Sequence, residues 1–266
     1  MIQLGHFLPG ASPLTTEKGS NETYRGIVEV GTARLAAYVK LLPDRQLVNE
    51  LLASVLGQLV GLPLPRGFLV SARLEDYPSS IVLQESGQPE MPAFAVETIA
   101  HQSLNRRLDL VSKPARELLF RTWPHWYRAA CFDDWIANAD RHTGNLLVGG
   151  RGEIWLIDHS LAFTGPKWVG ASLDPDLLTE NQLCQAMSVC LTPSEKALVM
   201  QECHAAVQQF ASINAVQAAH LAELVNLLEP SDLNSLTTFV STRVGSVAHR
   251  IGACLGVPEL PLGGVK

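Results

Sequence analysis

Residues 132–163 read FDDWIANADRHTGNLLVGGRGEIWLIDHSLAF and hold the densest group of polar side chains in the chain. A helix-like run ends at Asn138, so the polar residues that follow it predict a loop. Two short β-type segments on either side of a glycine-rich turn then predict a hairpin that returns the chain to Asp158. Asn145, at the start of this hairpin, and Asp158, at its end, are therefore expected at neighbouring strand ends.

The side chains of this stretch suit the handling of phosphates. Asn145 and Asp158 offer oxygen ligands, which a hard cation such as Mg²⁺ prefers, with phosphates and water completing its shell. Asp140 precedes Asn145 by five positions, and a carboxylate placed there could take the proton of an attacking hydroxyl. Taken singly, Asp140 is compatible with an ordinary loop residue and Asn145 with a turn former. The prediction therefore depends on the whole set.

Upstream of this stretch, the sequence combines β-type segments with one helical pattern. Segments 24–30 and 34–42 have β-type composition and are separated by a turn at Gly31. Residues 43–60 follow with apolar side chains at helical spacing and predict a helix. Further apolar segments predict more strands of an antiparallel sheet, at 67–70, 81–85 and 93–97.

From about residue 103 the pattern becomes helical, apart from the hairpin described above. Helices are predicted at 113–123, 125–138, 193–214 and 216–228. This order predicts an α+β fold, in which a β-rich part with one helix, residues 1–98, precedes a mainly helical part, residues 99–266.

Composition narrows the class of protein. The chain has 266 residues, of which 47% are hydrophobic and 17% charged, and this excludes a disordered chain. A net charge of −6 with scattered Lys and Arg argues against direct binding of nucleic acid. Five cysteines form no CxxC pair, which is typical of buried thiols in a reducing compartment. The start does not have the pattern of a signal peptide, and no stretch has the length of a membrane span, so we expect a soluble, cytoplasmic protein with no membrane partner.

A family resemblance is carried by the loop of residues 140–145, here called the catalytic-type loop. Asp140 and Asn145 repeat the D-x-x-x-x-N spacing of the protein-kinase catalytic loop, and Asp158 stands where such enzymes carry a second metal-binding Asp. Arg141 and His142 follow the Asp, which departs from the HRD order of ordinary protein kinases. This order is similar to that of the phosphatidylinositol kinases. Along its whole length, the stretch resembles more closely the C-terminal kinase domain of bacterial HipA-like kinases.

The resemblance implies a two-lobed, protein-kinase-like fold that uses ATP and Mg²⁺. Asp140 would be the catalytic residue that orients and deprotonates the acceptor hydroxyl, and Asn145 and Asp158 would hold the metal. A lysine that holds the α- and β-phosphates is expected on a strand of the β-rich part. Lys40 is the candidate, because it is the only lysine in strand-like sequence there. Glu50, on the following helix, is the candidate for its ion-pair partner. Small residues beside Glu50 would let the helix approach the sheet closely: Ala53, Ser54 and Gly57.

The remaining nucleotide contacts are expected at two places in the β-rich part. A reduced phosphate loop without GxGxxG precedes the first predicted strand, and an ordinary turn is the alternative interpretation. Backbone groups near Val96–Thr98, where the two parts connect, are candidates for binding adenine. The cofactor-binding candidates are Gly19, Ser20, Asn21, Glu97 and Thr98.

Neighbours of the predicted catalytic residues have supporting roles in this interpretation. His142 is expected to orient the loop through hydrogen bonds and is a secondary catalytic candidate. Arg141 is expected to brace the loop or contact a phosphate. Of Asp133 and Asp134, one should brace the loop while the other is solvated.

The segment after the hairpin lacks the ordinary kinase switch, because His159 and Ser160 replace the usual Phe-Gly. Autophosphorylation is a hypothesis for the hydroxyl residues in and near the site, namely Ser20, Ser160, Thr164 and Ser172.

The resulting functional prediction is a HipA-like serine/threonine protein kinase with a protein acceptor. The resemblance further implies a toxin-like role and an antitoxin-like partner. Three alternatives stay open at this point. They are a lipid or small-molecule kinase, a nucleotide-sensing pseudokinase, and a metal hydrolase built on Asp140, His142, Asp158 and His159.

Overall fold

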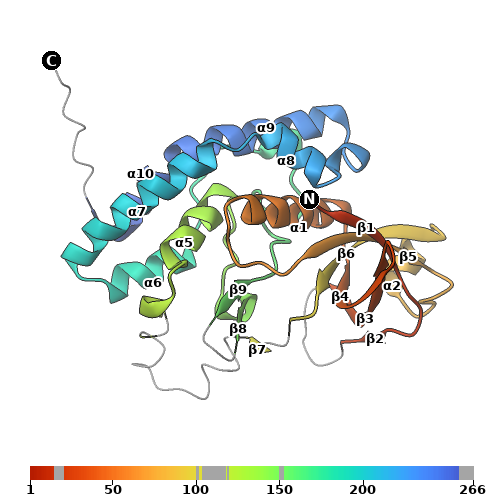
Figure 1. Cartoon of the computed structure of the whole chain (residues 1–266). Helices are drawn as coiled ribbons and strands as arrows, with labels where there is room; N and C mark the ends of the chain where they lie inside the picture. The colour runs from red at the N-terminus through yellow and green to blue at the C-terminus, as the bar shows by residue number, and fades with distance from the viewer. Residues whose placement is uncertain (15–20, 100–101, 104–117, 119, 150–152, 258–266) are drawn as a thin grey trace.

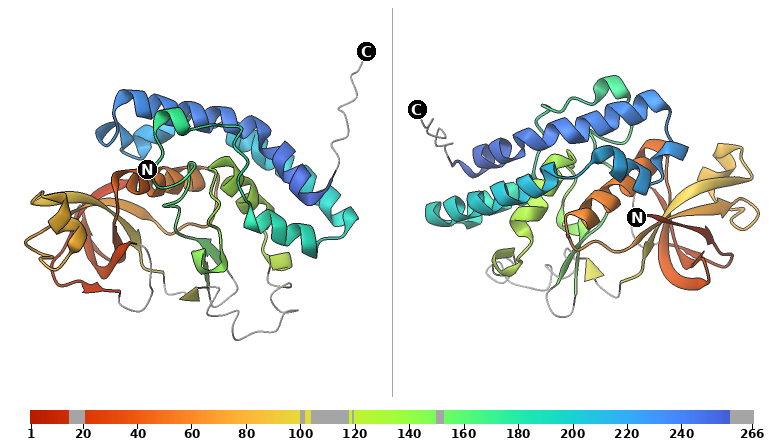
Figure 2. Two further views of the ribbon diagram at one scale, coloured as in Figure 1. Left: turned by 180° about the vertical axis from the view of Figure 1, so that it is seen from behind. Right: turned by 45° about the horizontal axis from the view of Figure 1, so that its top comes forward.

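The computed structural model describes residues 1–14, 21–99, 102–103, 118, 120–149 and 153–257 (Figure 1). The fold is α+β. Strands from the first hundred residues gather at one end of the molecule, and the helices of the last eighty residues extend over the other end and over the centre, as Figure 2 also shows. The predicted order of a β-rich part followed by a mainly helical part is confirmed.

The N-terminal strands form a six-stranded sheet with the order β1-β5-β6-β4-β3-β2 among the described residues. Strand β1 pairs in parallel with β5 and also in antiparallel with β3, so the sheet closes into a barrel. Apolar side chains such as Phe7, Val28 and Phe68 fill its interior. The strands are β1 (Gln3–Phe7), β2 (Ser12–Pro13), β3 (Glu22–Val30), β4 (Ala33–Leu41), β5 (Gly67–Arg73) and β6 (Glu90–Glu97).

Helix α1 (Asp44–Leu59) lies between the barrel and the C-terminal helices (Figures 1 and 2). It begins directly after Pro43, and the chain leaves it at Gly61, whose φ of +70° favours glycine. All its residues from Leu47 to Gly57 are buried. Its apolar side chains belong to the larger hydrophobic core, which also contains Phe132 and the apolar residues of the C-terminal helices. The helix that carries Glu50 is thus fixed on all sides.

The C-terminal part contains a small second sheet and a layer of helices. The second sheet has the order β7-β8-β9, and Leu146 pairs with Leu156 in its hairpin. Its strands are β7 (Gln102–Ser103), β8 (Leu146–Val148) and β9 (Ile154–Leu156). The α-helices described in this part are α5 (Trp126–Trp135), α6 (Gln182–Cys190), α7 (Pro193–Ala211), α8 (Ala215–Leu221), α9 (Pro230–Arg243) and α10 (Val247–Leu255).

Two predictions about the β-rich part are wrong. Residues 81–85, expected as a strand, form helix α2 (Ile81–Ser86), because the Ser80 side chain caps its start and Gly87 ends it in the left-handed conformation. The described part of residues 1–98 therefore contains two α-helices, not one. Strand β1 was not predicted, although it closes the barrel.

The predicted helices of the second part differ mainly at their ends. Helix α5 ends at Trp135 rather than at Asn138, since Ala137 has a φ of +50° and cannot continue a right-handed helix. Helix α8 ends at Leu221, well before residue 228. The helix predicted at 113–123 and the turn predicted at 149–152 lie mostly outside the described residues.

The close approach of α1 to the barrel provides a first testable prediction. A Cβ atom added at Gly67 of β5 would lie 2.8 Å from Ser54 Oγ of α1 and 2.9 Å from the Phe94 ring. We expect Gly67→Ala to lower the free energy of unfolding by about 1–3 kcal/mol through overpacking, measured by denaturant titration. Gly245→Ala is the matched control, because nothing lies within 4 Å of its added Cβ. Equal stabilities of the two variants would contradict the prediction.

Candidate active site

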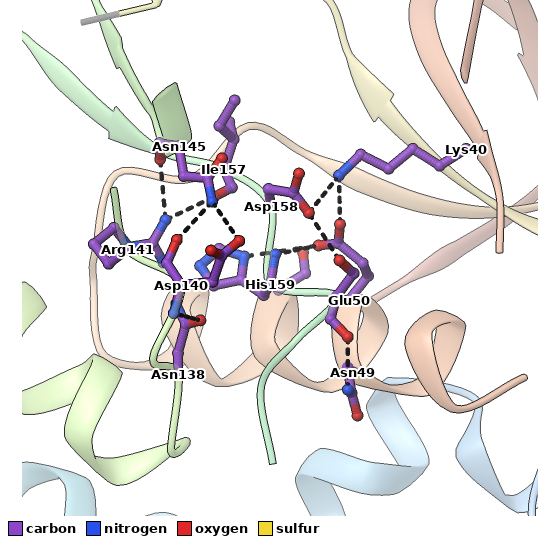
Figure 3. Close-up of polar contacts among 12 residues, drawn as sticks. Lys40, Asn49, Glu50, Asn138, Asp140, Arg141, Asn145, Ile157, Asp158 and His159 are labelled. Atoms are coloured by element: carbon purple, nitrogen blue, oxygen red, sulfur yellow. Dashed lines mark hydrogen bonds and ion pairs between the residues drawn. The ribbon is translucent and has the colours of Figure 1, made fainter. Parts of the chain in front are cut away.

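Lys40 of β4 reaches across to carboxylates from two other elements (Figure 3). Its Nζ atom lies 2.6 Å from Glu50 Oε1 on helix α1 and 3.0 Å from Asp158 Oδ1, just after strand β9. The Lys40–Glu50 ion pair expected from the sequence is therefore present. The lysine also contacts Asp158. Its ammonium group therefore joins the barrel, helix α1 and the end of the β8–β9 hairpin.

Burial and charge set the protonation states of this group. Burial alone would lower the pKa of Lys40, but the carboxylates of Glu50 and Asp158 outweigh it and raise this pKa above its ordinary value. Burial alone would raise the pKa of Glu50, yet the Lys40 ammonium and a hydrogen bond from His159 hold it well below the usual range. The lysine is thus cationic and the glutamate anionic at neutral pH, as an electrostatic clamp on phosphates requires.

The catalytic-type loop is held together by Asn145. Its Nδ2 atom donates to the backbone carbonyl of Asp140 at 2.7 Å and to Asp140 Oδ2 at 3.2 Å. This leaves the Asn145 side-chain oxygen free of that contact and available as a ligand. The Asp140 amide donates to Asn138 Oδ1 at 3.2 Å, and the Ile157 amide donates to the Asn145 carbonyl at 3.1 Å. These bonds join the loop to the end of the hairpin, so Asp140, Asn145 and Asp158 lie on one side of the same site (Figure 3).

The Arg141 side chain is buried behind the catalytic-type loop and holds it in place. Its side chain is 1% exposed, and Nε and Nη2 donate to the two carboxylate oxygens of Asp133 at 3.0 and 2.9 Å. Nη1 donates to the carbonyls of Asn145 and Ile157 at 3.0 and 2.6 Å. One guanidinium thus fixes the helix before the loop, the loop itself and the end of the hairpin.

The prediction that one of the two adjacent aspartates is solvated is wrong. Asp133 is the one that braces the loop, but Asp134 is 3% exposed and pairs with Arg250 of helix α10 at 2.7 Å. Burial raises the pKa of Asp134, and this effect outweighs the hydrogen bonds from Arg250, which act to lower the pKa. Sequence reasoning could not find this pair, because Arg250 lies 116 residues away.

His142 and His159 occupy different environments. The His142 ring is largely exposed, and its Nδ1 accepts a hydrogen bond from the Gly144 amide at 3.0 Å, which is a loop-orienting contact. His159 is buried and its backbone amide donates to Glu50 Oε2 at 3.0 Å. Burial, together with the Arg141 charge, lowers the pKa of the His159 ring, so this ring is neutral at pH 7.

The other predicted contacts are placed only in part. Gly19 and Ser20 lie outside the described residues. Asn21 is described, and its Nδ2 donates to Gln46 Oε1 of helix α1 at 2.8 Å. Of the hydroxyl residues considered for autophosphorylation, Ser20 is also outside the described residues, Ser160 is buried and donates to Asp158 Oδ1, and Ser172 is exposed.

The backbone near the expected adenine position is partly occupied. The amide of Glu97 donates to the Arg66 carbonyl, and that of Thr98 donates to the Ala36 carbonyl, both at 2.9 Å. The Glu97 side chain pairs with Arg66 at 2.7 Å. Adenine recognition at Glu97 and Thr98 would therefore have to use other groups. The Thr98 hydroxyl is buried and has no hydrogen-bond partner among the described residues.

The donor set beside Lys40 fits magnesium better than zinc. Asp158, Asn145 and Asp140 offer carboxylate and amide oxygens, which are the ligands that Mg²⁺ prefers. Among the described residues, no group of three or more His, Cys, Asp or Glu side chains could hold a metal ion by themselves. The two histidines of the metal-hydrolase alternative lie in different surroundings, since the His142 side chain is exposed and His159 is buried.

A closed β-barrel whose lysine meets an aspartate and a helical glutamate, beside a D-x-x-x-x-N loop, defines a protein of the kinase class. A family model confirms this class and is more specific. The model of the HipA-like kinase matches residues 36–215, and the chain belongs to this family.

A solved structure agrees with this fold. The proinflammatory kinase CtkA of Helicobacter pylori superposes with a TM-score of 0.56 at 11% sequence identity, over 95% of this chain and 98% of that one. HipA of Shewanella oneidensis MR-1, solved with HipB and operator DNA, gives a TM-score of 0.46 at 14% identity, over 96% of this chain and 69% of that one. No curated protein matches the sequence significantly.

No helix in the described part of the chain combines the length and the hydrophobicity needed to cross a membrane.

Asn49, which was not predicted to have a role, is fully buried beside Glu50 and binds the segment that follows Asp158. No sequence signal pointed to it, because most of its partners are backbone carbonyls.

Proposed function

We propose that this chain is an ATP-dependent kinase that transfers the γ-phosphate to a serine or threonine hydroxyl of a protein. In this proposal, residues 1–98 and 99–266 act as two lobes with the nucleotide between them. The observation that carries it is the meeting of Lys40 and Glu50 with Asp158, beside Asp140 and Asn145. Family membership supports the kinase class, and the protein acceptor rests on the resemblance described above.

Each side chain of the site has a defined task in the proposed reaction. Lys40 binds the α- and β-phosphates, and Glu50 keeps its ammonium charged and directed into the site. Asn145 and Asp158 would hold Mg²⁺, which when bound would neutralise charge on the phosphates. Asp140 accepts the hydrogen bond of the acceptor hydroxyl, aligns its oxygen with the γ-phosphorus and takes its proton.

Positioning contributes most of the rate enhancement in this scheme. The Arg141 brace and the Asn145 contact hold the Asp140 backbone before any substrate arrives. A fixed base and a fixed cation lose little entropy when the acceptor binds, and such preorganisation is the main source of catalysis in phosphoryl transfer. A cytoplasmic location, a toxin-like role and an antitoxin-like partner are further parts of the proposal, and they rest on the family resemblance alone.

A labelling experiment tests the proposed function directly. The purified chain is incubated with γ-labelled ATP, Mg²⁺ and a bacterial protein extract, and label on serine or threonine of a protein is expected. Label found only in lipid or small-molecule fractions would favour the lipid or small-molecule kinase. Nucleotide binding without any transfer would favour a nucleotide sensor and overturn the proposed activity.

Lys40→Met provides the matching variant prediction. The substitution removes the cation that faces the phosphates, and loss of one partner of a close charge pair weakens binding by roughly 30-fold or more. We expect the affinity for Mg-ATP, measured by calorimetry, to fall accordingly and label transfer to be lost. Lys196→Met, on helix α7, is the control and should bind ATP as the wild type does. Unchanged ATP affinity in Lys40→Met would contradict the assignment.

A further inference from the structure

Asn49 is a fully buried residue of helix α1, and both polar atoms of its side chain have their partners in one segment. Its Nδ2 group has two hydrogens, which three carbonyls share: those of Ser160, Ala162 and Gly165 lie 2.8, 2.9 and 3.1 Å from the nitrogen. Its Oδ1 atom accepts from the Trp168 indole at 2.8 Å. These partners all lie in residues 158–168, here called the post-hairpin segment, which begins with Asp158. One side chain of helix α1 thus binds this segment at four points.

The post-hairpin segment has a backbone that needs external support. Asp158, Phe163 and Thr164 have φ angles of +58°, +53° and +72°. These angles lie in the left-handed region, which residues other than glycine rarely adopt. Such a backbone conformation is energetically costly and persists only where the surroundings hold it. The carbonyls that Asn49 binds flank these strained residues, so the amide is placed where this support is needed.

Neighbouring contacts extend the same attachment. Glu50, the next residue of α1, accepts the His159 amide at 3.0 Å, so two consecutive helix residues hold the start of the segment. At its far end, the Arg45 guanidinium lies 4.2 Å from the centre of the Trp168 ring and pairs with Asp232 of α9. Helix α1 is itself held in place, because its central residues are buried in the larger core. It therefore provides a fixed support for the segment.

We propose that Asn49 is a positioning residue that holds the post-hairpin segment on helix α1, so that the Asp158 carboxylate stays beside Lys40. This inference rests on the proposed function, since it concerns the carboxylate assigned to Mg²⁺. It extends that function by naming the device that replaces the Phe-Gly packing of ordinary kinases. The catalytic geometry is thereby built into the fold.

The first test measures the segment itself and needs no activity. In Asn49→Ala, we expect backbone amides of residues 159–165 to exchange hydrogen about tenfold faster or more than in the wild type, by mass spectrometry without nucleotide. Peptides from β4 and α10 should exchange at the wild-type rate. Asn181→Ala is the control for loss of a buried asparagine, because Asn181 caps helix α6 away from the site. Unchanged exchange in the post-hairpin segment would overturn the proposal.

The second test measures the metal dependence of ATP binding by calorimetry. In Asn49→Ala, we expect the gain in ATP affinity on adding Mg²⁺ to shrink about tenfold, while ATP affinity without metal stays within about twofold of the wild type. Trp168→Phe removes only the indole hydrogen bond to Asn49 Oδ1 and should give an intermediate effect. Asn181→Ala should retain the full gain. A merely structural role would lower stability in Asn49→Ala and Asn181→Ala alike without changing this gain, and that result would overturn the proposal.

These readouts separate the two claims. If the wild type transfers no phosphate, the proposed function fails, but hydrogen exchange and metal-dependent binding still decide the role of Asn49. If the wild type is active and Asn49→Ala keeps both its segment protection and its response to Mg²⁺, the proposed function stands and the role of Asn49 is refuted.

Discussion

Replacing Asp140 with asparagine is expected to lower the rate of phosphoryl transfer by roughly 10²- to 10⁴-fold, which is the usual contribution of a general base. The affinity for Mg-ATP should stay within about twofold of the wild type, because Lys40 and Glu50 are untouched. The substitution keeps the shape of the side chain and an oxygen that can accept the Asn145 hydrogen bond, now 3.2 Å long. What it removes is the negative charge and the basicity that the acceptor hydroxyl requires.

The measurement is a steady-state rate with γ-labelled ATP, combined with calorimetric ATP binding for the same preparation. Glu75→Gln is the matched control, since it converts an exposed carboxylate of the barrel to an amide and should leave the rate unchanged. A fall in ATP affinity as large as the fall in rate would show that Asp140 acts in binding. A rate within threefold of the wild type would remove Asp140 from the proposed chemistry.

Asp133→Ala is expected to cause the largest loss of stability of the variants considered. It leaves the buried Arg141 side chain without a counter-charge, and it also removes the acceptor of the Asn138 side-chain amide. Breaking a buried ion pair on one side costs about 3–5 kcal/mol, which is a large part of the 5–15 kcal/mol that holds a typical domain together. Denaturant titration of the free energy of unfolding measures the effect.

An exposed ion pair of the same chain supplies the control. Arg34 Nε lies 3.6 Å from Glu29 Oε1 on the barrel surface. Glu29→Ala should lower the free energy of unfolding by less than about 1 kcal/mol. The double variant Asp133→Leu, Arg141→Met should recover much of the lost stability, because no unpaired charge remains buried. Equal losses in Asp133→Ala and Glu29→Ala would refute the bracing role of Asp133.

Local patterns in the sequence predicted the parts of the fold that local interactions determine. Helix α1 was expected at 43–60 and lies at Asp44–Leu59, because apolar spacing, a proline before it and a glycine after it all agree. The loop and hairpin from Asp140 to Asp158 were expected for the same reason, since turn residues and short β-type segments alternate over a short stretch. The Lys40–Glu50 pair was expected from spacing and the family resemblance together.

Features that depend on distant partners escaped prediction. Strand β1 pairs with β5 over sixty residues away, and a short segment such as Gln3–Phe7 carries no strong pattern of its own. The strand expected at 81–85 is a helix, because a short apolar run does not distinguish the two and the caps at Ser80 and Gly87 decide. Asn49 and Asp134 were missed as buried polar groups, since their partners come from segments brought near only by the fold.

Helix α1 contributes to the same apolar core as the C-terminal helices, and this has a consequence for how the molecule comes apart. A fragment that stops at residue 98 would expose Leu47, Leu51 and Val55 to water and would be prone to aggregate. The proposed division into two lobes at residue 98 is thus not expected to separate the chain into independently stable pieces. Thermal melting of the intact chain should show one cooperative transition, with both halves losing structure at the same temperature.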